Sequence, residues 1–386
     1  MLALAAAAAL FVAFWGHAVP VGAVFLSVVS LVIGGTVAFV CLRHAGAAAV
    51  AVLAPLPGLL AAGPFALAGG AAYSNLLAAY ALGYLVAICV SGDIVRRVLE
   101  GADAETAARG ALADILLPAG VVMLAGAALV IGWLFRGVPR LGLSAAAELI
   151  AVTLSALLYT SFAATLLPFG ESFFANANRT RERRESLVRL AARVVEPRWG
   201  MSLSGAALVV ATLGGFAAQP VLAQPALWAA SLLLLFLAAF AAGRDWRDAL
   251  AATLALATLM LASLMLWGRV TRHLTAASFL DIATAAAAAL FVVATMLWRI
   301  RSYRGDMANV ARLRALEDMG LAPWFGALGG AAAILPWIVL HGSIAALAAM
   351  AVLVGAAGLI AMPALATALE TLIPRRRSVD ELYGRG

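Results

Sequence analysis

Two carboxylic acids, Glu148 and Asp281, are the residues of this sequence best placed for chemistry, because each lies inside an apolar stretch. A charged side chain at bilayer depth costs ~2.5–3.5 kcal/mol, so an ionisable group in a membrane segment is by default a candidate proton or cation site. Both acids are expected about one turn inside the outer end of a helix, close enough to the surface to be hydrated. We therefore favour interfacial acids neutralised by arginines of the preceding loops over an ion site: Arg136, Arg140, Arg269 and Arg272.

No other residues have the spacing of a catalytic or metal site. The sequence shows no nucleophile–base pair, no glycine-rich phosphate loop and no metal-ligand motif, so no enzyme activity, cofactor or metal is predicted. The two cysteines, Cys41 and Cys89, fall within or at the end of apolar stretches and are interpreted as small buried hydrophobes. Three histidines expected at the outer face are interpreted as ordinary interfacial residues rather than metal ligands: His17, His273 and His341.

The composition predicts which elements carry these residues. The chain of 386 residues is 65% apolar and only 12% charged, with a mean hydropathy of +1.03. A soluble domain carries about twice that charged fraction, and apolar stretches of the ~20 residues that span a bilayer recur along the chain. We predict an all-α integral membrane protein with about twelve transmembrane helices, near 2–16, 20–42, 47–70, 73–92, 113–135, 144–168, 203–219, 226–243, 249–268, 278–298, 322–341 and 344–369.

The arginines predict the orientation. The formal net charge of +7 comes from arginine without any lysine, and the arginines sit in short segments between apolar spans. With both termini inside, 22 arginines fall in cytoplasmic segments and 4 in outer loops, which is a strong positive-inside signal. We therefore expect a multi-pass protein of the bacterial inner membrane with cytoplasmic N and C termini, and no nucleic-acid partner.

The chain matches itself at an offset of 204 residues, which indicates an internal duplication. Both halves contain six predicted helices, so the two repeats are expected to be parallel and related by an axis along the membrane normal. The predicted domains are a first six-helix repeat (1–170), an Arg-rich cytoplasmic linker (171–202), a second six-helix repeat (203–371) and a cytoplasmic tail (372–386). The informative matches are Arg97 with Arg301, Gly101 with Gly305, Asp114 with Asp318, and Trp133 with Trp337.

A polar stretch of roughly twenty residues follows the fourth helix of each half, at Ser91–Asp114 and Arg299–Met319. In the second stretch, apolar residues recur at three-residue intervals with arginines on the other side, which is typical of an amphipathic helix in the membrane interface. We therefore predict an interfacial cytoplasmic helix after helices 4 and 10, with a charged loop as the alternative. Prolines interrupt some spans, Pro55 among them; kinks filled by neighbouring helices are favoured over a substrate site.

This pattern resembles the transmembrane core of the resistance-nodulation-division (RND) superfamily, and within it the lipid-exporting MmpL-like and hopanoid-exporter-like proteins. The motif that carries the resemblance is Arg96, Arg97 and Gly101 followed by Asp103-Ala104-Glu105-Thr106-Ala107. Arg301 and Gly305 form a looser second copy, and Met362-Pro363-Ala364-Leu365 resembles the family's ending. The resemblance implies a transporter of a lipid or other hydrophobic molecule.

Two departures from the family modify this expectation. The loops after the first and seventh helices are each under about ten residues, where the family inserts a large porter domain. The fourth helix also has no mid-membrane acid, so we expect no proton relay within the chain. The bilayer and a hydrophobic substrate are the expected contacts, together with a periplasmic or membrane partner subunit. The alternatives are a non-transporting accessory or scaffold subunit and a major-facilitator-type carrier.

Overall fold

The computed structural model describes residues 21–71, 73–134, 138–166, 197–217, 225–270, 276–303, 307–341, 352–353 and 357–372. The predicted first helix (2–16), residues 171–196 of the linker and nearly all of the tail lie outside the described residues. Gly305, His17 and His273 lie outside them as well. Within the described residues the secondary structure consists of helices, and no strand occurs.

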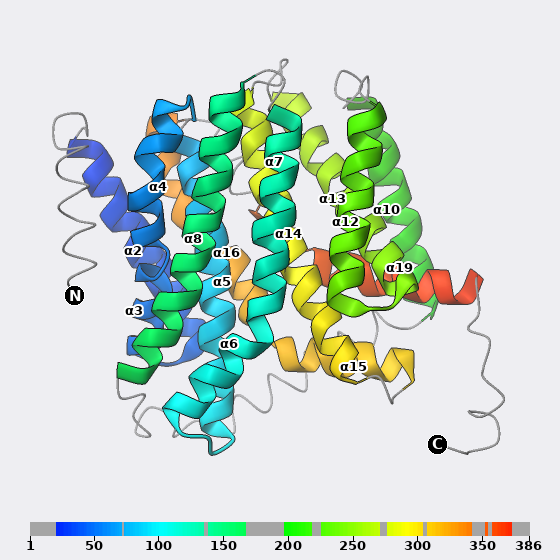
Figure 1. Cartoon of the computed structure of the whole chain (residues 1–386), viewed down its shortest axis with the longest axis horizontal. Helices are drawn as coiled ribbons and strands as arrows, with labels where there is room; N and C mark the ends of the chain where they lie inside the picture. Colours follow the sequence, from blue (N-terminus) through cyan, green and yellow to red (C-terminus); the bar gives the residue numbers. More distant parts are fainter. Residues whose placement is uncertain are drawn as a thin grey trace.

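The helices stand side by side as a bundle (Figure 1). The first half contains α2 (Val21–Leu42), α3 (Ala45–Leu53), α4 (Leu56–Ala68), α5 (Tyr73–Leu99), α6 (Ala104–Val121), a π-helical turn (Val122–Gly126), α7 (Ala127–Leu134) and α8 (Pro139–Leu166). The second half contains α10 (Pro197–Ala217), α12 (Pro225–Gly243), α13 (Trp246–Val270), α14 (Ala276–Ser302), α15 (Ala308–Met319), α16 (Ala322–Ile334), a 3₁₀ turn (Leu335–Trp337), α17 (Ile338–His341) and α19 (Gly358–Leu372).

The predicted fold class, an all-α membrane protein, is confirmed. Among the described residues, eight helices are long and apolar enough to cross a bilayer, and a bent pair adds a ninth. Apolar side chains such as Phe25, Leu208 and Leu233 remain exposed on the outside of the bundle, as expected of helices that face lipid. The full twelve-helix layout stays a prediction, because parts of it fall outside the described residues.

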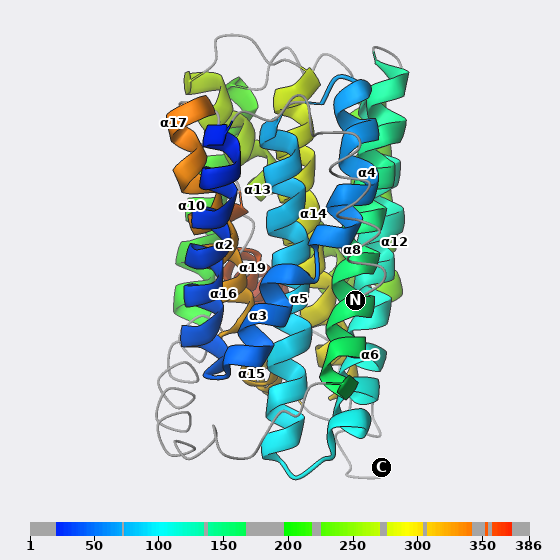
Figure 2. The same cartoon turned by 90° about the vertical axis from the view of Figure 1, so that its left-hand side faces the viewer.

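Helices α5 and α14 form the centre of the bundle. Each has 27 residues, and they begin 203 positions apart in the sequence. They contact each other and run in the same direction, as Figures 1 and 2 show. The arginine-bearing ends of both helices lie at one end of the bundle, which we call the arginine-rich end. The opposite end, where α5 and α14 begin, is the arginine-poor end.

The two matched tryptophans make reciprocal hydrogen bonds between the halves. Trp133 Nε1 in the first half donates to Ser231 Oγ on α12 at 2.9 Å. Trp337 Nε1 in the second half donates to Ser30 Oγ on α2 at 3.1 Å. Because α2 and α12 hold corresponding places in their halves, this exchange agrees with the predicted parallel duplication.

The halves differ in the segment that follows the central helix. In the second half, α15 lies across the arginine-rich end (Figure 1) and meets the segment that begins with α16 at 49°. Gly320 separates the two at a φ of +57°, which favours glycine. In the first half, α6, the π turn and α7 form one 31-residue span, Ala104–Leu134. The predicted separate helix after helix 4 is therefore wrong, because no such break interrupts Ala104–Leu134.

The proline break between α3 and α4 is filled by neighbouring side chains. Ser155 Oγ on α8 donates to Ala54 O at 2.6 Å and accepts from Gly58 N at 3.1 Å. Tyr80 on α5 donates its hydroxyl to Val52 O at 3.2 Å. Backbone groups on both sides of the break at Pro55 are thus satisfied by side chains of neighbouring helices, as expected of a filled kink.

Candidate functional site

The structure brings Glu148 and Asp281 together with a third polar residue, Asn75. Asp281 lies in the second turn of α14, and its Oδ1 accepts a hydrogen bond from Asn75 Nδ2 on α5 at 2.6 Å. Glu148 on α8 is close enough for its charge to interact with that of Asp281. Because α5 packs against both α8 and α14, three helices from the two halves supply this acid cluster.

The acid cluster is buried, contrary to the expectation that both acids are hydrated. Glu148 is 2% exposed, Asp281 1% and Asn75 1%. Glu148 Oε1 has no hydrogen-bond partner among the described residues. A buried polar atom in that state costs free energy, which makes Glu148 a candidate functional residue.

An apolar layer explains why the acids are shielded at the arginine-poor end. On α8, Leu141 and Ala145 lie on the same face as Glu148, two turns and one turn nearer that end. They pack into one buried cluster with residues of α7 and α14: Val130, Leu134, Leu280 and Ala283. Depth counted along a single helix misses this layer, because the shielding residues come from its neighbours. The predicted neutralisation by Arg140 is not observed, since this arginine is exposed.

The π-helical turn between α6 and α7 lies beside this region. It packs against α8 and α14, and a β-carbon placed at Gly126 would lie 3.2 Å from Leu149 Cδ1 and 3.5 Å from Ala287 Cβ. Leu149 is the residue next to Glu148. Single π turns within helices are frequent at functional sites, so the local backbone supports the choice of this cluster.

A second polar cluster joins the halves at the arginine-rich end. Asp93 on α5 is 4% exposed and lies 2.6 Å from Arg96 Nη2, 3.1 Å from Arg97 Nε and 3.1 Å from Arg299 Nη2. Arg299 belongs to α14, so its bond crosses between the halves. We call this group the inner charge cluster; its full compensation by guanidinium groups suits a structural contact.

The residues of the repeat motif separate into different roles. Arg97 pairs with Asp114 at 2.5 Å, and Gly101 has a φ of +98° in the turn between α5 and α6. In the second copy, Asp318 accepts a hydrogen bond from the Tyr303 hydroxyl, while Arg301 lies over the ring of Trp298 at 4.9 Å. The structure therefore places Arg97, Arg301 and Asp318 near helix ends, Gly101 in a turn and Asp114 within α6.

A buried ion triad that the sequence did not predict fixes α15. Arg312 is fully buried and donates to Asp248 Oδ1 on α13 at 2.6 Å. It also donates to Glu370 on α19 at 2.9 and 3.0 Å. The periodicity of this segment assigned its arginines to a solvated face. It therefore did not predict that Arg312 is buried or that Asp248 and Glu370 bind it.

Asn75 is the residue of the acid cluster that the sequence analysis missed. A lone amide at the start of a long apolar helix was the available signal, although helix ends often carry polar residues. Its partner, Asp281, is 206 positions away, and the offset that relates the repeats does not pair them. Only the packing of α5 on α14 brings the two side chains together.

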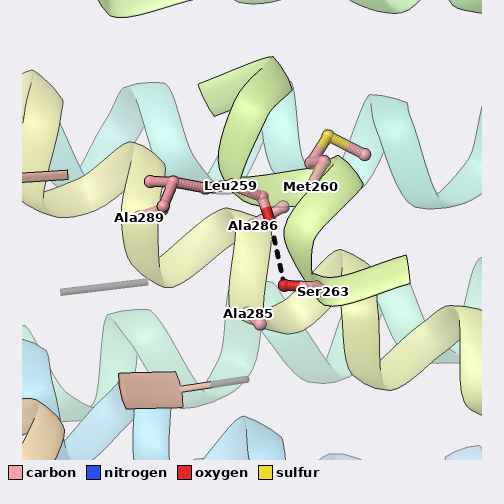
Figure 3. Close-up of a pocket in the computed structure, with 6 residues that line it drawn as sticks. All are labelled: Leu259, Met260, Ser263, Ala285, Ala286 and Ala289. Atoms are coloured by element: carbon pink, nitrogen blue, oxygen red, sulfur yellow. Dashed lines mark hydrogen bonds between the residues drawn. The ribbon is translucent and has the colours of Figure 1, made fainter. Parts of the chain in front are cut away.

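A small apolar crevice lies between two helices of the second half. This crevice between α13 and α14 is lined by Leu259, Met260, Ser263, Ala285, Ala286 and Ala289 (Figure 3). Ser263 Oγ donates to the Leu259 carbonyl at 2.9 Å within its own helix, so the crevice is apolar. Within the described residues, no group of three His, Cys, Asp or Glu side chains could hold a metal ion.

The fold is similar to that of SecDF, although the sequence is not. No family model matches the chain, and no curated protein matches it. SecDF from Thermus thermophilus, a translocon-associated membrane protein, superposes with a TM-score of 0.58 at 15% identity over 91% of this chain. SecDF in its super-membrane-facing form gives the same TM-score and identity over 94%. The chain spans 63% and 64% of these SecDF chains, just under two thirds of their length.

SecDF is a membrane protein of the RND superfamily, so the comparison supports the superfamily-level resemblance at the level of the fold. The chain is thus a multi-pass membrane protein with a SecDF-like arrangement of helices. At this level of identity, the similarity concerns the fold and assigns no activity to individual residues.

Proposed function

We propose that this chain is a transporter of the bacterial inner membrane that moves a lipid or another hydrophobic molecule, with the acid cluster of Asn75, Glu148 and Asp281 as its coupling site. The observation that carries the proposal is the burial of two acids from different halves, Glu148 at 2% and Asp281 at 1% exposed. Intramembrane acids are functional candidates by default. The arginine-rich end faces the cytoplasm in this proposal, as the positive-inside pattern favours.

The apolar character of the core supports a hydrophobic substrate. A polar solute that passed between the halves would meet few hydrogen-bonding partners and would lose its hydration without compensation. The crevice in Figure 3 is lined almost entirely by apolar groups. An MmpL-like or hopanoid-exporter-like role remains the specific form of this proposal.

The acid cluster supports a proton as the coupling ion. Two carboxyl groups buried near each other cannot both be ionised without electrostatic cost, whereas one shared proton removes that cost. A metal cation would require more oxygen ligands than these three side chains provide. The expectation of a chain without a proton relay rested on two reasons, the lack of a mid-membrane acid in the fourth helix and the hydration of the two outer acids. The burial of Glu148 and Asp281 bears on the second reason alone.

The test uses the purified chain in liposomes that carry a pH-sensitive dye inside and a fluorescent phospholipid analogue. Under an imposed proton gradient, we expect proton flux that depends on the lipid probe. The variants Glu148→Gln and Asp281→Asn should each reduce this flux at least tenfold. Glu105→Gln is the matched control, because Glu105 is exposed and pairs only with Arg109 on the surface of α6.

Flux that survives both substitutions would contradict the coupling role of the acid cluster. Lipid transfer that persists without proton flux would identify a passive carrier instead. No transfer under any condition would contradict the transporter assignment.

A second candidate is an accessory subunit that works with a partner in the membrane. The short connection between α10 and α12, residues 218–224, favours it, because a chain that exports a molecule needs a path beyond the membrane. SecDF is described as translocon-associated, and an analogous partnership is the concrete form of this candidate. Cross-linking in native membranes followed by purification through the C-terminal tail tests it, with a stoichiometric membrane protein as the expected result.

A further inference from the structure

The ends of three helices of the second half meet at one corner of the arginine-rich end. Near the start of α10, the sulfur of Met201 accepts a hydrogen bond from the hydroxyl of Thr371, at the end of α19, at 3.7 Å. The start of α13 lies at the same place, because Arg312 donates to both Asp248 of α13 and Glu370 of α19. Helices α10 and α13 also pack against each other. Segments that are distant in the sequence thus form one surface.

Large apolar side chains are exposed where these helices meet. Trp199 on α10 is 54% exposed, Trp246 on α13 is 48% exposed, and Leu372 at the end of α19 is 69% exposed. Trp246 is the first residue of one apolar span, and Gly243 is the last residue of the span before it. Tryptophan is enriched where the hydrocarbon of a bilayer meets the headgroups. We therefore place the two tryptophans at that boundary of the membrane.

Three arginines accompany the two tryptophans. Arg198 precedes Trp199, while Arg244 and Arg247 lie on either side of Trp246 in the sequence. Arg198 and Arg244 are exposed and Arg247 is partly exposed, and the guanidinium carbon of Arg247 lies 5.3 Å from the ring centre of Trp246. We call these five residues the corner patch. It combines apolar rings with positive charge at the edge of the membrane.

The arginines of the corner patch differ from those that hold the fold together at the same end of the bundle. The guanidinium groups of the inner charge cluster surround Asp93, and Arg312 pairs with two buried acids. Among the residues that the structure describes, no carboxylate forms an ion pair with Arg198, Arg244 or Arg247. Their charge is therefore available to an anion from outside the chain.

We propose that the corner patch binds the headgroup of an anionic phospholipid. The three arginines bind its phosphate, because the planar guanidinium group matches phosphate geometry. The rings of Trp199 and Trp246 pack against the glycerol and the first acyl carbons. A free phosphate ion would gain nothing from these rings, whereas a membrane lipid uses both the charge and the apolar surface. This inference goes beyond the proposed function, because it needs neither a transported substrate nor a proton.

The test measures the quenching of tryptophan fluorescence by brominated lipids in bilayers that contain the purified protein. In one series the brominated lipid is phosphatidylglycerol, and in the other it is phosphatidylcholine; each is diluted into unlabelled phosphatidylcholine. The signal of the corner patch is the difference between the native protein and the variant Trp199→Phe with Trp246→Phe. We expect phosphatidylglycerol to quench this signal half-maximally at a mole fraction about fivefold lower than phosphatidylcholine, the gain from one basic residue at an anionic surface.

The variant Arg198→Gln with Arg244→Gln and Arg247→Gln should abolish the preference, so that both lipids quench at the same mole fraction. Arg109→Gln is the matched control. Arg109 is exposed on α6 near the same end of the bundle and pairs with Glu105, so its loss should leave the preference unchanged. At ~1 M salt, where the screening length is ~3 Å, the preference of the native protein should decrease.

Equal quenching by the two lipids in the native protein would overturn the proposal, because the surface would then contact lipid without recognising a headgroup. A preference that persists in the triple arginine variant would overturn it as well. If neither lipid quenches the two tryptophans, protein covers the corner patch, for example a second copy of this chain, and the lipid site is wrong. The measurement uses no proton gradient, so its outcome and that of the transport assay are independent.

Discussion

The two halves differ in the segment that follows the central helix, α5 in the first half and α14 in the second. In the first half, α6 leads without interruption into the span that ends at Leu134. In the second half, Gly320 breaks the chain between α15 and α16. The residue 204 positions before Gly320 is Leu116, which lies inside α6. The duplicated segment thus forms one continuous span in the first half and two helices that meet at 49° in the second. We call α15, which Arg312 attaches to α13 and α19, the brace.

The side chains on this segment differ in the same way. Arg312 on α15 is buried against Asp248 and Glu370, whereas Ala108, its counterpart at the 204-residue offset, is a small buried residue of α6. The counterpart of Asp248 is His44, which caps the N-terminus of α3 by accepting a hydrogen bond from Ala47 N at 3.0 Å. The second half therefore fixes its cross-lying helix by ion pairs, and the first half relies on close apolar packing.

This difference predicts which of the two central helices, α5 or α14, is held more rigidly. Helix α15 connects α14 to α16, and Arg312 attaches it to α13 and α19. A movement of α14 must therefore be transmitted through α15 to the outer helices of its half. The first half has no such attachment at Ala108, so we expect α5 to move more freely than α14.

The largest expected effect comes from removing the brace. Arg312→Ala would leave Asp248 and Glu370 buried without their cation, and breaking a buried ion pair in this way costs about 3–5 kcal/mol. Thermal unfolding in detergent, followed by circular dichroism, should show a large loss of stability. Arg109→Ala is the matched control, since its pair with Glu105 is exposed and contributes only about 0.3–0.5 kcal/mol.

A triple variant sharpens this prediction. Replacing the whole triad by apolar residues, Arg312→Met with Asp248→Leu and Glu370→Leu, removes the charges together and should restore most of the lost stability. If Arg312→Ala unfolds at the temperature of the native protein, α15 is not fixed by the triad and the contrast between the halves is wrong.

The next effect concerns the break itself. Gly320 has a φ of +57° and a ψ of −144°, a conformation that other residues adopt at a cost of about 1–3 kcal/mol. Gly320→Ala should lower the unfolding temperature accordingly. Leu116→Gly is the comparison in the first half, and it should cost about 1 kcal/mol through lost helix propensity. If Gly320→Ala unfolds at the temperature of the native protein, the break between α15 and α16 does not depend on a glycine at position 320.

The sequence predicted the helices better than it predicted their contacts. Apolar length and arginine placement are properties of each segment, so the spans and the arginine-rich end could be recognised one at a time. The shielding of Glu148 comes from residues of α7, α8 and α14, and Asn75, which bonds to Asp281, lies on α5, 206 positions away. The difference between the halves was also hidden, because an amphipathic period at Ala308–Met319 does not show that Arg312 points inward.

The cap of α3 gives a smaller, pH-dependent difference between the halves. Burial lowers the pKa of His44 below its ordinary value, so the unfolded chain binds a proton first as the pH falls. The stability that neutral His44 provides is therefore complete above about pH 6.5 and is lost as the pH drops toward the lowered pKa. A cap of this kind contributes about 1 kcal/mol.

The measurement compares unfolding at pH 7.5 and 5.5 for the native protein and for His44→Asn. Asparagine is a favoured cap that does not titrate, so the variant should lose less stability on acidification than the native chain. Identical losses would show that the proton on His44 is not linked to folding.

The smallest effect compares the two matched acids, Asp114 and Asp318. Arg97 pairs with Asp114 in the first half, whereas the Tyr303 hydroxyl donates to Asp318 in the second. The counterpart of Tyr303 in the first half is Leu99, which has no donor. The same acid position is thus held by a group that stays charged in one half and by a group that titrates in the other.

The hydrogen bond to Asp318 raises the pKa of Tyr303 above its ordinary value near 10. A raised pKa means that its stabilising contribution is complete below pH 10 and is lost as the pH rises through the raised value. Because Tyr303 is only partly buried, that contribution is about 0.5–1 kcal/mol. Unfolding from pH 8 to 11 should show an alkaline decrease that Tyr303→Phe reduces. Arg97→Leu should lower stability by an amount that stays constant over this range, because guanidinium keeps its proton there. A pH-independent effect of Tyr303→Phe would mean that the two acids are held in the same way, and the halves would then differ only in the brace formed by α15.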